Sequence, residues 1–279
     1  MPFRIWSNPY PISLVGGLLV SNAVIEGQDV LVILDTGAPG LVLNSKYYSP
    51  DENTAFPCIG INGRFDCYTH QVKNWSWLEK KYKKTNALLS DLSFLEKSLH
   101  KEVHALIGLS VLEDYYISID FDRMSISLSE KMKPDKTSML RFQYIDKLPV
   151  ITCNVNGEKK ILGLDTGSEI NYLFTPNPTN DSYLLANASP VLVVGTENKE
   201  DLKYQMQMDV DLNQGKEYKS EFVVDQDSHG NFHNESFDGF LGLAFLSKFN
   251  ITIHPSRQVI FLSPRKSAEN LPVILTAQL

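Results

Sequence analysis

The tripeptide Asp-Thr-Gly occurs twice in the chain, at Asp35-Thr36-Gly37 and at Asp165-Thr166-Gly167. If a fold brings two carboxylates to within about 3 Å of each other, they cannot both ionise cheaply, so the pair shares one proton and titrates as a unit. One carboxylate can then act as a base toward a water molecule while the other acts as an acid. Asp35 and Asp165 are therefore the candidate catalytic residues, and the chemistry that they predict is hydrolysis by an activated water.

The elements that must position the two aspartates are also repeated. Each aspartate follows a short apolar run, residues 30–34 or 160–164, that is typical of a buried β-strand. A glycine turn, Glu26-Gly27 or Asn156-Gly157, precedes each run and predicts a β-hairpin. Each half of the chain thus begins with a hairpin, continues into a strand and reaches Asp-Thr-Gly.

A longer segment of the sequence is also repeated. Residues 106–129 align without a gap with residues 240–263, at an offset of 134 that is close to the offset of 130 between the two aspartates. Nine of the 24 aligned positions are identical, and in the first copy they are Gly108, Leu109, Leu112, Ile117, Ile119, Arg123, Ile126, Leu128 and Ser129. Because only small insertions separate the copies, we expect one structural unit to occur twice.

The doubled pattern resembles the two-lobed aspartic peptidases of the pepsin and retropepsin superfamily. In that family each lobe carries Asp-Thr/Ser-Gly followed much later by two apolar residues and a glycine, here Leu106-Ile107-Gly108 and Phe240-Leu241-Gly242. The sequence pattern that follows these glycines is most similar to that of bacterial retropepsin-like proteins. The resemblance implies an all-β, bilobal aspartic-protease fold with pseudo-twofold symmetry, closed, double-psi-type β lobes and a cleft between them.

The same resemblance implies the domain organisation. We expect an N-terminal lobe at residues 1–130, a linker at 131–147 and a C-terminal lobe at 148–279. Strands at both chain termini, including residues 271–276, are expected to join a sheet beneath the lobes. A chain that contains both lobes is expected to act as a monomer.

In the family, the two aspartates hold and activate one water, so the mechanism needs no metal, cofactor or covalent intermediate. The hydroxyls of Thr36 and Thr166 brace one lobe against the other. Gly37 and Gly167 allow a tight turn and a close approach of backbone N–H groups to the carboxylates. The resemblance therefore implies an aspartic endopeptidase with a peptide or protein substrate.

The residues after the glycines differ between the two halves. The first half has Ala38 and the second has Ser168, so only the second can donate a hydroxyl hydrogen bond to its aspartate. Fewer donors stabilise the ionised form less, which predicts an activity optimum less acidic than that of gastric pepsins. Pro39 is unusual and stiffens the first loop, and Glu169 adds a third carboxylate that we expect to point outward.

Family members close the cleft with a β-hairpin flap, and residues 58–70 occupy the corresponding interval. Tyr68 is therefore a candidate flap aromatic that covers substrate. Residues 191–208 predict a matching hairpin in the second half, which adds Gly195 and Thr196 as candidate substrate-binding residues. Two flaps would be retropepsin-like, and one would be pepsin-like.

Cys58 and Cys67 flank Asn62-Gly63, a strong hairpin signal. If Asn62 and Gly63 form the turn, the two cysteines face each other at a non-hydrogen-bonded pair, where a disulfide is geometrically allowed. A bridge would indicate a secreted or periplasmic protein, whereas reduced cysteines would fit the cytosol. The sequence shows no signal peptide, and the compartment stays open.

Composition and charge exclude other classes of protein. A net charge of −7 argues against a nucleic-acid or anionic-membrane partner. No stretch approaches the ~20 apolar residues of a membrane span. His229 and His233 have helical spacing but lie in a polar stretch with a glycine, so we expect no metal site there.

Two functions remain open at this stage. The first is the aspartic endopeptidase. The alternative is a catalytically weak or inactive peptide- or protein-binding module that keeps the fold, which Ala38, Pro39 and the poorly defined first flap suggest. Aspartyl-phosphate chemistry would need a second Asp or Lys-Thr-Gly after the nucleophile, and neither Asp35 nor Asp165 has that context.

Overall fold

The structure is a computed structural model that describes residues 8–52, 54–60, 63–132, 138–174, 188–194, 200–225 and 236–266. Most of these residues lie in β-strands, and the helical elements are short: α1 (Ser93–Leu99), the 3-10 helix η1 (Leu109–Leu112) and α3 (Leu243–Leu246). No helix within this part of the chain is long and apolar enough to cross a bilayer. The expected all-β class is confirmed.

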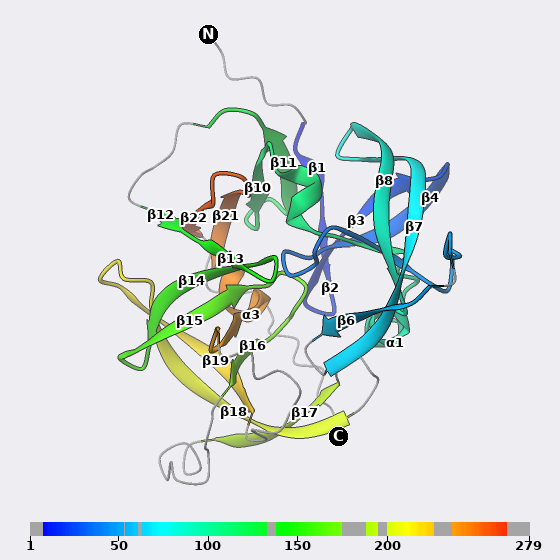
Figure 1. Cartoon of the computed structure of the whole chain (residues 1–279). Coiled ribbons are helices and arrows are strands. Elements are labelled where there is room, and N and C mark those ends of the chain that lie inside the picture. Colours follow the sequence, from blue (N-terminus) through cyan, green and yellow to red (C-terminus); the bar gives the residue numbers. More distant parts are fainter. Residues whose placement is uncertain are drawn as a thin grey trace.

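Eight strands from the first half of the chain form one sheet (Figure 1, blue to cyan). Their spatial order is β2-β3-β4-β9-β5-β8-β7-β6, and a further pairing between β3 and β7 folds the sheet back on itself. The strands are β2 (Ser13–Val15), β3 (Leu18–Ile25), β4 (Gln28–Leu34), β5 (Leu41–Asn44), β6 (Phe56–Gly60), β7 (Gly63–Trp77), β8 (Lys80–Ser90) and β9 (Ala105–Ile107). We call the part of the molecule built on this sheet the first lobe.

A second sheet of eight strands repeats the first strand for strand. Its order is β13-β14-β15-β20-β16-β19-β18-β17, with the corresponding extra pairing between β14 and β18. The strands are β13 (Gln143–Ile145), β14 (Leu148–Val155), β15 (Glu158–Leu164), β16 (Asn171–Phe174), β17 (Ser189–Val194), β18 (Glu200–Asp211), β19 (Glu217–Asp225) and β20 (Gly239–Leu241). We call the part built on this sheet the second lobe, which lies beside the first in Figure 1 (green to yellow).

A third sheet joins the lobes and is itself symmetric, with the order β1-β11-β10-β21-β22-β12. Its strands are β1 (Tyr10–Pro11), β10 (Tyr116–Asp120), β11 (Ser125–Ser129), β12 (Met139–Arg141), β21 (Phe249–His254) and β22 (Val259–Pro264). At its centre Ser118 pairs with Thr252, and their hydroxyl oxygens lie 3.0 Å apart. These two residues are equivalent positions of the repeat, so a pseudo-twofold axis passes between them.

The segment expected as a linker, residues 131–147, contains structure. Residues 139–145 form β12 and β13, which are the counterparts of β1 and β2 in the other half. The alternation of apolar and polar residues in this segment is therefore a strand pattern. Residues 271–276, expected as a terminal strand, lie outside the described residues.

The hairpin that precedes each aspartate is confirmed. Ile25 pairs with Gln28 and Val155 with Glu158, which leaves two turn residues in each hairpin. Both residues of each turn have positive φ: Glu26 at 50° and Gly27 at 85°, Asn156 at 49° and Gly157 at 81°. Two consecutive left-handed residues suit the right-handed twist of the flanking strands, which explains the preference for asparagine and glycine there.

The strands that lead to the aspartates are buried at their carboxyl ends, directly before Asp35 and Asp165. The last three residues of β4 and of β15 are all buried. Each strand lies inside its sheet, between an antiparallel partner and a parallel one, β9 or β20. Burial on both faces accounts for the unbroken apolar runs seen in the sequence.

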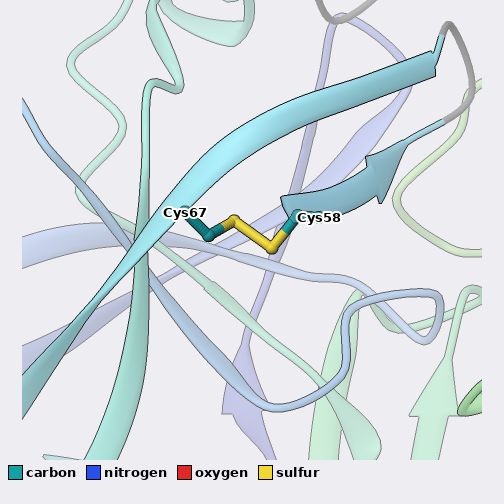
Figure 2. The surroundings of a disulfide bond; sticks show 2 residues. All are labelled: Cys58 and Cys67. Atoms are coloured by element: carbon teal, nitrogen blue, oxygen red, sulfur yellow. A yellow bond between two sulfur atoms is a disulfide. The ribbon is translucent and has the colours of Figure 1, made fainter. Parts of the chain in front are cut away.

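Cys58 and Cys67 form a disulfide between β6 and β7, with a Cα–Cα distance of 5.8 Å (Figure 2). The predicted register of this hairpin is wrong. Gly60 pairs with Gly63, so Gly63 is the first residue of β7, and Cys67 stands opposite Phe56. The cysteines are diagonal neighbours, which a twisted antiparallel pair brings within reach of each other.

Candidate active site

The two Asp-Thr-Gly segments begin where β4 and β15 end, and the neighbouring parallel strands fix their backbones. The N–H of Asp35 donates to the carbonyl oxygen of Ile107 at 3.0 Å. The N–H of Asp165 donates to the carbonyl oxygen of Leu241, also at 3.0 Å. The backbone of each aspartate is thus held by the apolar residue directly before Gly108 or Gly242 of its own lobe.

Thr36 and Thr166 connect the two lobes through four buried hydrogen bonds. The backbone N–H of each threonine donates to the hydroxyl oxygen of the other at 3.0 Å. The Thr36 hydroxyl donates to the carbonyl of Leu164 at 2.6 Å, and the Thr166 hydroxyl donates to the carbonyl of Leu34 at 2.8 Å. The residues beside the two aspartates are therefore locked together across the pseudo-twofold axis.

This lock brings the carboxyl groups so close together that each of them shifts the pKa of the other. A Cβ added to Gly37 would lie 3.0 Å from a carboxyl oxygen of Asp165, and one added to Gly167 would overlap the carboxyl of Asp35. Only glycine leaves each carboxyl group room beside the opposite loop. Both aspartates keep partial solvent exposure, so water can reach them.

The two carboxylates receive different numbers of backbone donors. Oδ1 of Asp35 accepts from the N–H groups of Gly37 at 2.8 Å and Ala38 at 2.9 Å. Oδ1 of Asp165 accepts from Gly167 alone, at 2.8 Å. Hydrogen bonds to the ionised form stabilise it, so the first lobe stabilises its carboxylate more strongly than the second does.

Burial among protein atoms disfavours the charged form and so raises the pKa of both carboxyls. For Asp35, the N–H donors of Gly37 and Ala38 oppose that rise. For Asp165, the negative charge of Asp35 adds to the effect of burial, and its pKa lies well above the ordinary value. The pair therefore favours a single proton on Asp165 beside an ionised Asp35.

Ser168 does not have the role expected for it. Its hydroxyl donates to the carbonyl of Ile170 at 3.0 Å and accepts from the N–H of the same residue at 3.3 Å. The hydroxyl is therefore used to shape the loop after the second Asp-Thr-Gly. The asymmetry of donors between the lobes is the reverse of the expected one, because Ala38 contributes through its backbone.

The glycines of the apolar-apolar-glycine segments lie under the aspartate loops. A Cβ on Gly108 would overlap the carbonyl oxygen of Ala38, and one on Gly242 would overlap that of Ile170. The N–H of Gly242 also donates to the side chain of the fully buried Asn171 at 2.9 Å. Asn171 supports the site but was missed from sequence, where its only signal is an amide at the start of an otherwise apolar strand.

Glu169 is solvent-exposed, and its negative charge nevertheless helps to raise the pKa of Asp165. Surrounding protein atoms also raise the pKa of Glu169 itself. Glu169 and the aspartate pair thus share one electrostatic environment.

The candidate flap residues are only partly described. Tyr68 pairs with Leu89 in the sheet, and its half-buried side chain packs against the main core. The expected second hairpin exists as β17 and β18, but Gly195 and Thr196 lie outside the described residues. The hairpins β6–β7 and β17–β18 occupy equivalent places at the ends of the two sheets.

Among the described residues, no group of three or more His, Cys, Asp or Glu side chains could hold a metal ion. His229 and His233 lie outside those residues. No model of a known protein family matches the chain, and no curated protein is significantly similar to it in sequence. What the site can do must therefore be judged from its own geometry.

Proposed function

We propose that the chain is an aspartic endopeptidase of the pepsin and retropepsin superfamily. The observation that carries the proposal is the close approach of Asp35 and Asp165 across a pseudo-twofold axis, each carboxyl lying against the glycine of the opposite loop, with unequal stabilisation of their charges. Carboxyl pairs that share one proton are suited to activate a water molecule and to protonate an acceptor in the same step.

The architecture supports the same assignment. Two sheets of identical strand order each deliver one aspartate, and a third symmetric sheet joins them. This arrangement, together with the threonine hydroxyls that brace the lobes, supports the proposal of a bilobal aspartic-protease fold. Because one chain supplies both aspartates, we propose that it acts as a monomer.

In the proposed reaction, the Asp35 carboxylate takes a proton from water, and the water oxygen attacks the scissile carbonyl carbon. Asp165 donates its proton to the carbonyl oxygen, which gives a gem-diol. The proton on Asp35 then passes to the amide nitrogen as the C–N bond breaks, and a gem-diol proton returns to Asp165. The products are a carboxylic acid and an amine, and the pair regains its starting state.

The proposed substrate is an extended peptide or protein segment. An extended chain can pair its backbone with strand edges while alternate side chains enter pockets. The hairpins β6–β7 and β17–β18 stand at the ends of the two sheets, and we propose that they act as two flaps. The Cys58–Cys67 bridge fits a protein that works in an oxidising, extracytoplasmic environment.

The test is cleavage of a peptide library from about pH 3 to about pH 7 by the wild-type chain, by Asp35→Asn and by Asp165→Asn. We expect cleavage by the wild type alone, with a loss of at least about 10²-fold in each variant, and inhibition by a statine-type peptide. Cleavage that survives either substitution would exclude the mechanism. Inhibitor binding without cleavage would favour the alternative, a peptide-binding module.

A further inference from the structure

Glu169 occupies a position that differs in chemistry between the lobes. It lies four residues after Asp165, and its counterpart four residues after Asp35 is Pro39. The two loops are otherwise equivalent, since each follows Asp-Thr-Gly and each crosses a glycine of its own lobe. One side of the catalytic pair therefore carries a carboxylate that the other side lacks.

Glu169 lies against residues of both lobes. Its carbonyl oxygen accepts from the N–H of Ala244 in α3 at 3.0 Å. Gly17, in the turn between β2 and β3 of the first lobe, is so close that an added Cβ would lie 2.8 Å from the Cβ of Glu169. The residue thus sits at the seam between the lobes, beside the aspartate pair.

Among the residues that the structure describes, no cation balances the carboxylate of Glu169. It forms no ion pair with any described residue, and only its own backbone N–H offsets the cost of its crowded environment. Its charge nevertheless reaches Asp165. An exposed carboxylate without an ion-pair partner is free to pair with a cation that a ligand brings to it.

We propose that Glu169 is a specificity-determining residue that binds a lysine or arginine side chain of the substrate. The inference rests on the proposed peptidase function and names the substrate class of the same site. Pro39 offers no charge at the equivalent place in the first lobe. A basic side chain is therefore recognised on one side of the scissile bond only, which fixes the direction in which the peptide lies.

The physical basis is a charge-assisted contact between the Glu169 carboxylate and the basic side chain of the substrate. Hydrogen bonds to charged groups contribute more than neutral ones, and a contact of this kind corresponds to about a 10- to 100-fold preference. The chain as a whole has a net charge of −7, so a basic substrate is also attracted over longer distances.

The experiment uses a parent peptide that the wild-type chain cleaves, with lysine or norleucine placed at each position in turn. Norleucine keeps the aliphatic stem of lysine and removes its charge. We expect one position at which lysine raises kcat/KM over norleucine by at least about tenfold in the wild type, and by less than about twofold in Glu169→Gln. The ratio within each protein cancels any general effect of the substitution on the aspartate pair.

Glu217→Gln is the matched control, because it removes the same charge from an exposed position on β19 of the same lobe. It should keep the lysine preference. A preference that persists in Glu169→Gln, or that appears at no position, would overturn the inference while cleavage of neutral peptides still upheld the proposed function.

If no peptide is cleaved, the same pairs of side chains are compared in statine-type peptides by calorimetry. A lysine preference in binding that Glu169→Gln abolishes would support the inference even though turnover had failed. Equal binding of the lysine and norleucine peptides, or no binding of either, would refute it.

Discussion

At the scale of single residues, Asp35 and Asp165 are chemically identical but are placed in different surroundings. Two backbone N–H groups stabilise the charge on Asp35, whereas one does so for Asp165, which also feels the charges of Asp35 and Glu169. In the proposed reaction, this difference assigns the role of base to Asp35 and the role of acid to Asp165. The difference in donors arises from the path of the backbone, and so it could not be predicted from two identical tripeptides.

The pH dependence of activity follows from these surroundings. As the pH falls through the pKa of Asp35, which lies above 3.8, the base becomes protonated and the rate falls. As the pH rises through the still higher pKa of Asp165, the acid loses its proton and the rate falls again. We expect a bell-shaped profile of kcat/KM with its maximum above pH 3.8.

This profile agrees with the less acidic optimum expected from sequence, although the reason is different. The expected reason was a missing hydroxyl donor, and Ser168 turns out to bond Ile170 instead. The profile is measured with a peptide substrate across acidic and neutral pH, with a stability control at each pH. A rate that keeps rising as the pH is lowered to about 2 would contradict the assignment.

At the scale of elements, each aspartate loop lies across the glycine of its lobe without room for a side chain. Gly242→Ala should force the carbonyl of Ile170 away and destabilise the protein by about 1 to 3 kcal/mol or more. Activity should fall as well, because the loop carries Asp165. Urea denaturation and peptide cleavage measure the two effects.

Gly157→Ala is the control for this substitution. Gly157 has a φ of 81° and nothing within 4 Å of an added Cβ, so alanine there costs only the strain of a left-handed residue, about 1 kcal/mol. If Gly242→Ala proved no more costly than Gly157→Ala, the close crossing of loop and strand would be wrong.

The hairpin formed by β6 and β7 is held by a covalent bond that its counterpart lacks, since the only other cysteine of the chain is Cys153. Removing the bridge in a Cys58→Ser, Cys67→Ser variant should destabilise the protein by about 2 to 3 kcal/mol. Reductant should lower the urea midpoint of the wild type and leave that of the variant unchanged. A wild-type midpoint insensitive to reductant would contradict the bridge.

The elements around the aspartates could be predicted because their signals are local. A two-residue turn that ends in glycine, an apolar run and a terminal aspartate each determine a short piece of backbone, and they recur in order. The register of the β6–β7 hairpin could not be predicted, since it depends on which pairs the longer β7 makes with the rest of the lobe. The strands at residues 139–145 were missed because their partners are far away in the sequence.

At the scale of the whole molecule, the two lobes are joined at both ends of the pseudo-twofold axis. The third sheet joins them at Ser118 and Thr252, and the threonines join them beside the aspartates. The pseudo-symmetric frame fixes the distance between the carboxyls. The differences that matter for chemistry, such as Glu169 against Pro39, lie in loops that the frame leaves free to vary.

The threonine lock gives a prediction about this frame. Thr166→Val removes an oxygen that accepts from the N–H of Thr36 and donates to the carbonyl of Leu34, and leaves both groups buried without a partner. We expect a loss of about 2 to 5 kcal/mol in stability, with a parallel fall in kcat. Thr166→Ser keeps the oxygen and should cost less than about 1 kcal/mol. Equal stability of the two variants would argue against the lock.

The most direct measurement is a crystal structure of the chain with a statine-type peptide. The hydroxyl of the statine unit replaces the attacking water, so we predict that it lies within hydrogen-bonding distance of both Asp35 and Asp165, with one inhibitor bound per chain. A peptide bound elsewhere, or carboxyl groups too far apart to contact the same hydroxyl, would contradict the assignment of these two aspartates as the catalytic pair.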